Sequence, residues 1–173
     1  AGSRMQQNFR GIRKSYGKIQ AGLHLLSLLQ RNLKDGDADE KMFAFIMSAF
    51  ATLDAIPDNK GVIWFFAHAT ELKLLTLLGI RPELSHCVEG HAVSENMFFD
   101  VHAGGLVCEK HRRPALSLAL TAPVRDLMHK SIEQEITSLI QETAKRKEWQ
   151  MFASVIRSYR KYNENKNFVP TRI

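Results

Sequence analysis

The segment from Val62 to Leu78 constrains the fold more than any other, because a helix wound from it is apolar on almost its whole circumference. A helix of that kind needs protein on every side. The run is too short for a membrane span, and it is interrupted by His68, Thr70, Glu71 and Lys73. We therefore predict that it is the central helix of a bundle and that Gly79 and Pro82 end it.

Two helices are predicted before this segment. The apolar face of the first has members spaced by three, four or seven residues, and it consists of Ile12, Tyr16, Ile19, Leu23, Leu26 and Leu33. Basic residues lie on its opposite face, and Gly36 is expected to end it. The second is predicted from Asp39 to Ala55, with an apolar face of Phe43, Ile46, Phe50 and Leu53.

Helical periodicity returns near the C-terminus. We predict a helix from Val124 to Lys130 and a new helix that begins at Ser131. A last helix is predicted over residues 147–163, and its inward face consists of Trp149, Phe152, Ile156 and Tyr159.

The helical pattern stops between residues 84 and 113. Met97–Val101 and Leu106–Cys108 suit short strands, and Gly104 followed by Gly105 suits the turn between them. This segment is therefore predicted to be a β-hairpin inserted into a helical protein.

Cysteine and histidine residues stand at both ends of this hairpin. Cys87 precedes His91 and, sixteen residues further on, Cys108 precedes His111. A tetrahedral zinc ion needs four converging sulfur or nitrogen donors, which two tight turns can supply. We predict a structural zinc ion bound by these four residues, with His86 and His102 as spare donors nearby. The alternative is a metal-free hairpin, since surface histidines are common without a metal.

The fold class that follows is all-α, a helical bundle of five or six helices with an inserted small zinc-knuckle β-hairpin. We expect 5–83 and 114–163 to form the two parts of the bundle and 84–113 the zinc-knuckle hairpin. Residues 1–4 are expected to be a cloning remnant and 164–173 a loose tail. With 45% hydrophobic residues among 173, the chain can bury a core of its own.

The sequence contains no motif of a common catalytic class. HExxH, GxSxG and P-loop patterns are missing, and a zinc ion with four protein ligands has no open position for a substrate. We therefore expect no enzyme activity. Two cysteines make a poor disulfide framework, and the first nine residues have no apolar run. A cytoplasmic protein without a membrane segment is expected.

Basic residues are the candidate partner contacts, because the chain has a net charge of +6. Clusters of this kind attract phosphates, or a carboxylate-rich peptide if an apolar pocket lies beside them. They are also common as solvated helix faces. The candidates for binding a partner or DNA are Arg10, Lys14, Lys18, Arg112, Arg113, Arg157, Arg160 and Lys161.

Two segments resemble a known family. The run from Glu71 to Cys87, ELKLLTLLGIRPELSHC, resembles the helix that leads into the zinc knuckle of the bacterial DNA repair and recombination mediator RecO. Residues 104–108 resemble the segment that enters the second half of that knuckle, and the resemblance covers about 9–162. RecO proteins usually carry Cys-x-x-Cys at both places. Cys87 and Cys108 therefore match two of the family's ligand cysteines directly. His111 stands at a third ligand position in place of cysteine, and His91 matches the fourth position by a shift of one residue.

The resemblance implies a non-catalytic accessory role in DNA repair and DNA recombination. RecO acts with RecR to load RecA onto DNA that is coated with single-strand-binding protein. Its helical domain receives the acidic, apolar C-terminal tail of that protein, and it binds DNA. This implies single-stranded DNA as a further partner and a bacterial, nucleoid-associated location. RecO also has an N-terminal OB-fold barrel, which has no counterpart in this sequence, so we expect that it was trimmed away or that the protein lacks it.

Two other functions remain open on the sequence. The first alternative is a zinc-stabilised helical protein-interaction scaffold with no nucleic-acid role, and the second is a metal-dependent enzyme. Salt-dependent binding to single-stranded DNA would distinguish the mediator from the scaffold. An open coordination position on the metal would favour the enzyme.

Overall fold

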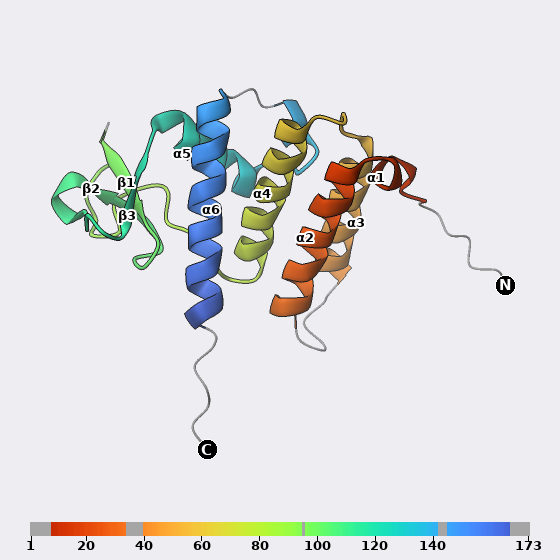
Figure 1. The fold of residues 1–173 in the computed structure, drawn as a ribbon. Helices are drawn as coiled ribbons and strands as arrows, with labels where there is room; N and C mark the ends of the chain where they lie inside the picture. The colour runs from red at the N-terminus through yellow and green to blue at the C-terminus, as the bar shows by residue number, and fades with distance from the viewer. Residues whose placement is uncertain (1–7, 34–39, 95, 142–144, 167–173) are drawn as a thin grey trace, which may run out of the picture.

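The computed structural model describes residues 8–33, 40–94, 96–141 and 145–166. These residues form a helical bundle with a small inserted sheet, which confirms the predicted fold class (Figure 1). The α-helices are α1 (Arg10–Lys14), α2 (Tyr16–Asn32), α3 (Glu40–Ala55), α4 (Lys60–Leu77), α5 (Ala122–Glu133) and α6 (Arg146–Lys166). The strands are β1 (Met97–Asp100), β2 (Gly105–Cys108) and β3 (Ser117–Leu120), and short 3-10 helices cover η1 (Glu109–His111) and η2 (Ser138–Gln141).

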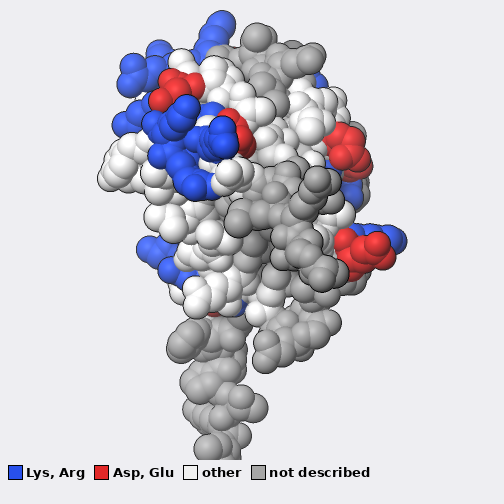
Figure 2. Space-filling model, turned by 90° about the vertical axis from the view of Figure 1, so that its right-hand side faces the viewer, with Lys and Arg blue, Asp and Glu red and all other residues white. Residues whose placement is uncertain are grey.

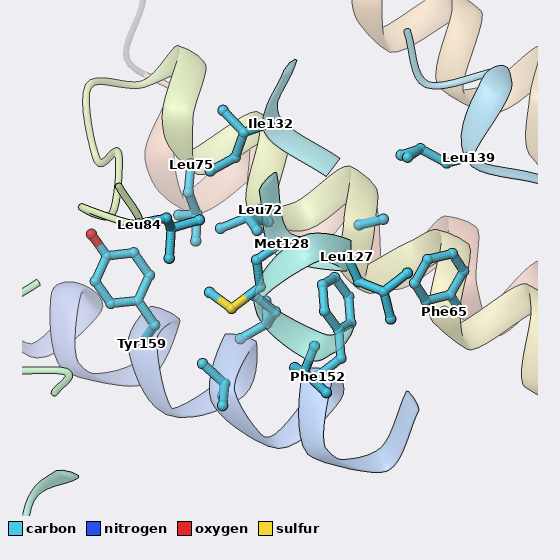
Figure 3. Close-up of a cluster of buried hydrophobic side chains, with 14 of the residues drawn as sticks. Phe65, Leu72, Leu75, Leu84, Leu127, Met128, Ile132, Leu139, Phe152 and Tyr159 are labelled. Atoms are coloured by element: carbon cyan, nitrogen blue, oxygen red, sulfur yellow. The ribbon is translucent and has the colours of Figure 1, made fainter. Parts of the chain in front are cut away.

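Helix α4 is the central helix, as the sequence predicted. It packs against α2, α5 and α6, and Figure 1 shows it between α2 and α6. Its start is fixed by Asn59, whose side-chain oxygen accepts hydrogen bonds from the backbone N–H of Gly61 at 2.9 Å and of Val62 at 3.2 Å. The core around it combines side chains from three helices, shown in Figure 3 as Phe65, Leu72 and Leu75 from α4, Leu127, Met128 and Ile132 from α5, and Phe152 and Tyr159 from α6.

The first predicted helix is two helices, so the prediction of one continuous helix is wrong. The chain breaks at Ser15, which has an extended backbone and starts α2 by accepting a hydrogen bond from the backbone N–H of Lys18 at 3.2 Å. The Ser15 hydroxyl also donates to Asp58 at 2.6 Å. The predicted end at Gly36 and the predicted start of the next helix at Asp39 lie outside the described residues.

The predicted apolar face of α2 is also wrong. Tyr16 is 76% exposed and Leu23 is 61% exposed, and Ile19 and Leu26 are exposed as well. The buried side consists of Ala21, Gly22, Leu25 and Leu28. A side-chain carbon added at Gly22 would lie 3.4 Å from the Phe50 ring. Small residues therefore mark the side on which α2 approaches its neighbours, and a count of large apolar residues misses that side.

Lys18 is buried rather than available to a partner, which corrects its place among the candidate contacts. Its ammonium group donates to the backbone oxygen of Asp54 at 2.7 Å. The side chain of Asp54 in turn accepts from the backbone N–H of Ile12 at 2.8 Å. Lys18 thus ties α2 to the end of α3.

Two further predictions change near the C-terminus. Ser131 does not begin a new helix, because α5 continues through it to Glu133 and its hydroxyl donates to the backbone oxygen of Leu127 at 2.6 Å. Helix α6 extends beyond the predicted end at residue 163 to Lys166. Residues 167–173, in the segment expected to be a loose tail, lie outside the described residues.

The inserted segment is a three-stranded antiparallel sheet in the order β2-β1-β3, so it has one strand more than the predicted hairpin. The segment that follows α4 joins it through a parallel bridge between Glu83 and Gly105. A side-chain carbon at Gly105 would lie 2.6 Å from the Glu83 backbone oxygen, so only glycine fits there. Met97, Phe99 and Leu106 belong to the same core cluster as the bundle. The sheet is therefore packed against the helices rather than separate from them.

The turn of this sheet is organised by Asp100, whose side chain is fully buried. Its carboxylate accepts hydrogen bonds from the backbone N–H groups of His102 and Ala103, each at 2.9 Å, and from the Ser117 hydroxyl at 2.9 Å. The Arg113 guanidinium donates from Nε at 2.8 Å. One carboxylate thus holds the β1–β2 turn, the segment before β3 and the start of β3 together.

We expect Asp100→Asn to lower the free energy of unfolding by about 1–3 kcal/mol, because the amide cannot accept all of these hydrogen bonds and leaves Arg113 without its anion. Urea unfolding monitored by circular dichroism measures the change. The control is Asp126→Asn on α5, whose exposed ion pair with Lys130 should contribute less than about 1 kcal/mol. Equal losses in the two variants would contradict this account of the turn.

The contribution of Asp100 should also depend on pH. Burial opposes ionisation, but hydrogen bonds from Arg113, Ala103 and Ser117 lower the pKa of this carboxyl from 3.8 to about 2. A carboxyl with a lowered pKa stabilises the fold fully above its unfolded pKa and loses that effect as the pH falls toward its folded pKa. The stability difference between wild type and Asp100→Asn should therefore shrink as the pH falls from about 4 to about 2. A difference that is constant over this range would refute the assignment.

Candidate metal centre and basic cleft

The loop before the sheet brings a cysteine and a histidine to the two ends of one tight turn. The backbone N–H of Cys87 donates to the oxygen of His91 at 2.9 Å, and the N–H of Gly90 donates to the oxygen of Cys87 at 2.7 Å. Gly90 has a φ of 82°, a conformation that glycine adopts without strain. The N–H of Val88 donates to the oxygen of Leu106 at 2.8 Å, so the turn lies beside β2.

Three of the four predicted zinc ligands form a compact group. The donor atoms of Cys87, Cys108 and His111 all lie within 4.8 Å of one another. His111 Nδ1 is 3.7 Å from Cys87 Sγ and 3.4 Å from Cys108 Sγ. His91 Nδ1 lies 3.4 Å from Cys108 Sγ, and the His91 and His111 rings are 4.6 Å apart. His91 is thus next to the group, but its side chain is exposed.

These separations fit a tetrahedral zinc ion. With Zn–S near 2.3 Å and Zn–N near 2.0–2.1 Å, a sulfur and a nitrogen on the same ion are about 3.5 Å apart. The three observed sulfur–nitrogen distances of 3.4, 3.4 and 3.7 Å agree with that value. The set of two thiols and two imidazoles is also a donor set that structural zinc uses.

The electrostatics of the turn favour a thiolate at Cys87. Burial of the side chain opposes ionisation, but hydrogen bonds from the backbone N–H groups of Glu89 and Cys108 and from His111 lower the pKa of the Cys87 thiol from 9.0 to about 7. Thiolate is the form that binds metal.

The two spare histidines have other partners. His86 Nδ1 lies 3.3 Å from a Glu83 carboxylate oxygen, and the His102 ring lies 4.2 Å from the Tyr162 ring.

The remaining basic candidates are not in one place. Arg10 and Lys14 are exposed on α1, which lies at the right of Figure 1. Figure 2 views the molecule from that side and shows a group of Lys and Arg atoms at its upper left. Arg113 is held by Asp100, and Arg112 lies over the Phe98 ring, 4.7 Å from its centre, while it pairs with Glu109 at 3.1 Å. None of these four residues lines the same pocket as Arg157 and Arg160.

Arg157 and Arg160 line a cleft between α4 and α6 that has a volume of about 910 Å³. Trp64 and Phe65 of α4 and Trp149 of α6 provide its aromatic surface, and the Phe65 and Trp149 rings stack at 5.7 Å. The other lining residues are His24, Lys60, Gly61, His68, Arg146, Gln150 and Ala153. Lys161, the third predicted basic residue of α6, is exposed and does not line the cleft.

The cleft offers polar groups that a ligand could use. Arg160 donates to Glu71 at 2.7 Å and to Glu164 at 3.1 Å, so its charge is compensated within the protein. No ion pair joins Lys60, Arg146 or Arg157 to a carboxylate of the residues described. The Trp149 Nε1 is the one buried side-chain nitrogen or oxygen without a hydrogen-bond partner in that part of the chain. Three cations that no described carboxylate pairs with therefore surround an apolar surface.

Arg157 and Arg160 are the candidate partner contacts that line this cleft. Lys60, His24 and His68 were not among the candidates, because their positions are far from α6 in the sequence and only the packing of α2, α4 and α6 brings them together. Trp64 was the one available signal. It is a large amphipathic ring on a helix that otherwise suits complete burial, and the structure leaves it half-buried in the cleft.

No helix among the described residues combines the length and the apolar character that a membrane crossing requires.

Comparisons with known proteins place this architecture in one family. Residues 13–166 match the family described as Recombination protein O C terminal. The chain is 29% identical over 109 residues to the DNA repair protein RecO of Exiguobacterium sp., which covers 63% of this chain and 42% of that protein. It is 28% identical over 109 residues to the DNA repair protein RecO of Enterococcus faecalis (63% of this chain, 40% of that protein) and 26% identical over 103 residues to that of Bacillus subtilis (60% and 39%).

The chain thus spans about two fifths of the length of the curated relatives it matches. The family match covers most of the chain and includes α2 to α6, the inserted sheet and the Cys and His residues described above. The predicted resemblance is confirmed, and the chain belongs to the RecO C-terminal family.

Proposed function

We propose that this protein is a non-catalytic DNA repair accessory domain whose cleft between α4 and α6 binds the acidic, apolar C-terminal tail of single-strand-binding protein. The observation that carries the proposal is the composition of the cleft. Aromatic side chains line it, and no carboxylate of the described residues pairs with the cations of Lys60, Arg146 and Arg157. An acidic peptide that ends in apolar residues and a carboxylate would supply apolar contacts to the aromatic side chains and carboxylates to the cations.

The wider role proposed for the domain is to help RecR and RecA act on DNA that single-strand-binding protein covers. Arg10 and Lys14 on α1, together with Arg112 beside the sheet, are exposed and would contact phosphates of single-stranded DNA. In a bacterial cell this places the protein in the cytoplasm at the nucleoid.

The metal part of the proposal is one structural zinc ion held by Cys87, Cys108, His111 and His91. Zinc would crosslink the turn that carries Cys87 and His91 to the segment that carries Cys108 and His111. The residues would contribute two thiolates and two neutral imidazoles, and the lowered pKa of Cys87 favours the form that this requires.

A scaffold without a nucleic-acid role is the second candidate, and one observation favours it. Arg10, Lys14 and Arg112, the residues proposed to contact phosphates, do not line the cleft, so peptide binding there does not require them. Binding to single-stranded DNA that weakens steeply as salt rises would favour the mediator, because phosphate contacts release counterions. Peptide binding without any DNA binding at low salt would favour the scaffold.

Protein purified without chelators and then dialysed should retain about one zinc ion per chain, measured by elemental analysis, because structural zinc sites bind tightly. His111→Gln should lose most of it, whereas His86→Gln, which changes a neighbouring histidine outside the compact group, should keep it. Circular dichroism should show that helix content survives chelation, since the bundle has its own core. A protein that retains no zinc while the turn stays ordered would contradict the metal proposal.

A fluorescent peptide that copies the acidic tail should bind the wild-type protein, as measured by anisotropy at low salt. Arg157→Ala should weaken binding by about tenfold or more, because a hydrogen bond to a charged group contributes about 1.5–3 kcal/mol. The matched control is Arg10→Ala, which removes the same charge outside the cleft and should have little effect. Absence of binding by the wild type would refute the proposed partner, and equal effects of the two variants would refute the cleft as its site.

A further inference from the structure

A second group of metal-binding side chains lies in the bundle, away from the cysteines. It consists of His24 on α2 and of His68 and Glu71 on α4, whose donor atoms all lie within 4.8 Å of one another. Glu71 Oε2 is 2.9 Å from His24 Nε2 and 3.0 Å from His68 Nδ1. Glu71 is fully buried and His68 is 4% exposed. Three neutral or anionic donors thus meet at one point of the interior.

The surroundings hold these donors in position. The other carboxylate oxygen of Glu71, Oε1, accepts from Arg160 Nε at 2.7 Å, which fixes the carboxylate so that Oε2 faces the two imidazoles. The Trp64 ring lies 6.2 Å from the His24 ring and 6.0 Å from the His68 ring. A hydrogen bond to the second oxygen of a ligating carboxylate is a usual feature of metal sites.

We propose that His24, His68 and Glu71 bind a divalent transition-metal ion such as zinc, cobalt or nickel. Two imidazoles and one carboxylate suit these ions, whereas magnesium and calcium prefer oxygen ligands. Nitrogen and oxygen donors on a tetrahedral ion are about 3.3 Å apart, so the observed 2.9 and 3.0 Å need to open by only a few tenths of an ångström. The ion binds the lone pairs of two neutral histidines and an ionised Glu71.

The site differs from the proposed zinc knuckle in its access to solvent. His24, His68 and Arg160 line the cleft, so the fourth position of the ion faces it. The ion brings two positive charges beside the Arg160 guanidinium, whereas Glu71 and Glu164 already balance that group. An anionic fourth ligand is therefore favoured. If the proposed function of the cleft is correct, a carboxylate of the bound tail can take that position, but metal binding itself does not depend on it.

The test uses the dialysed, zinc-containing protein and cobalt(II) as the probe. We expect one cobalt ion to bind per chain in addition to the zinc. Calorimetry and visible absorption measure this binding. Because this site has no thiolate, its spectrum should show weak d–d bands and no strong sulfur-to-cobalt charge-transfer band. A cobalt ion that displaced zinc from the cysteines would show that charge-transfer band, so the spectrum distinguishes the two sites.

Two variants and a control locate the ion. Each of His24→Gln and His68→Gln should weaken cobalt binding at least tenfold. Glutamine can still donate a hydrogen bond to Glu71, so the bundle should remain folded, which thermal unfolding checks. His129→Gln is the matched control, because His129 on α5 donates a hydrogen bond to the backbone oxygen of Leu84 and lies outside the group. It should bind cobalt as the wild type does.

The outcomes separate this proposal from the proposed function. If the wild type binds no cobalt beyond the knuckle, or if His24→Gln and His68→Gln bind it unchanged, the group is a hydrogen-bonded network only and the metal proposal is refuted. Titration of the tail peptide in metal-free buffer tests the function by itself. Enhancement of peptide binding by cobalt in the wild type, and its loss in His68→Gln, would further support an anionic fourth ligand, whereas cobalt-independent peptide binding would refute that part.

Discussion

The buried carboxylate of Glu71 is the contact on which the arrangement of the bundle depends. A charge that is fully removed from water must be compensated by partners with good geometry, because an unpaired buried charge costs several kcal/mol. Here the partners are His24 from α2, His68 one turn earlier on α4, and Arg160 from α6. Despite its burial, hydrogen bonds from the two histidines lower the pKa of Glu71 to about 2. Glu71 thereby connects α2, α4 and α6, the three helices whose side chains line the cleft.

The sheet depends on the bundle more than its small size suggests. Phe99 of β1 packs edge-on against Tyr159 of α6, with ring centres 5.3 Å apart, and it is fully buried. Leu106 and Met97 extend the same apolar core. The cysteines lie at the end of the sheet where Met97 of β1 pairs with Cys108 of β2, and Cys87 is itself part of the buried core. Metal binding would secure this end of the sheet, while the carboxylate of Asp100 holds the opposite end.

The sequence predicted the elements whose physical signal is local. The apolar run of α4, the glycine turn of the sheet and the spacing of Cys87, Cys108 and His111 are all visible within short windows. Two kinds of feature were not visible. The buried side of α2 is made by small residues such as Ala21 and Gly22, which large exposed residues such as Leu23 outweigh in any hydrophobicity count. The cleft joins helices that are far apart in the sequence, and a single sequence does not show which distant side chains meet in the fold.

The placement of the two tryptophans has a spectroscopic consequence. The chain contains only Trp64 and Trp149, and both line the same cleft, from opposite helices. The tryptophan emission of the protein therefore originates at a single surface, because the chain has no other indole. Any molecule that displaces water from this surface should change the emission wavelength directly. The native chain thus contains its own optical reporter of occupancy, without a label.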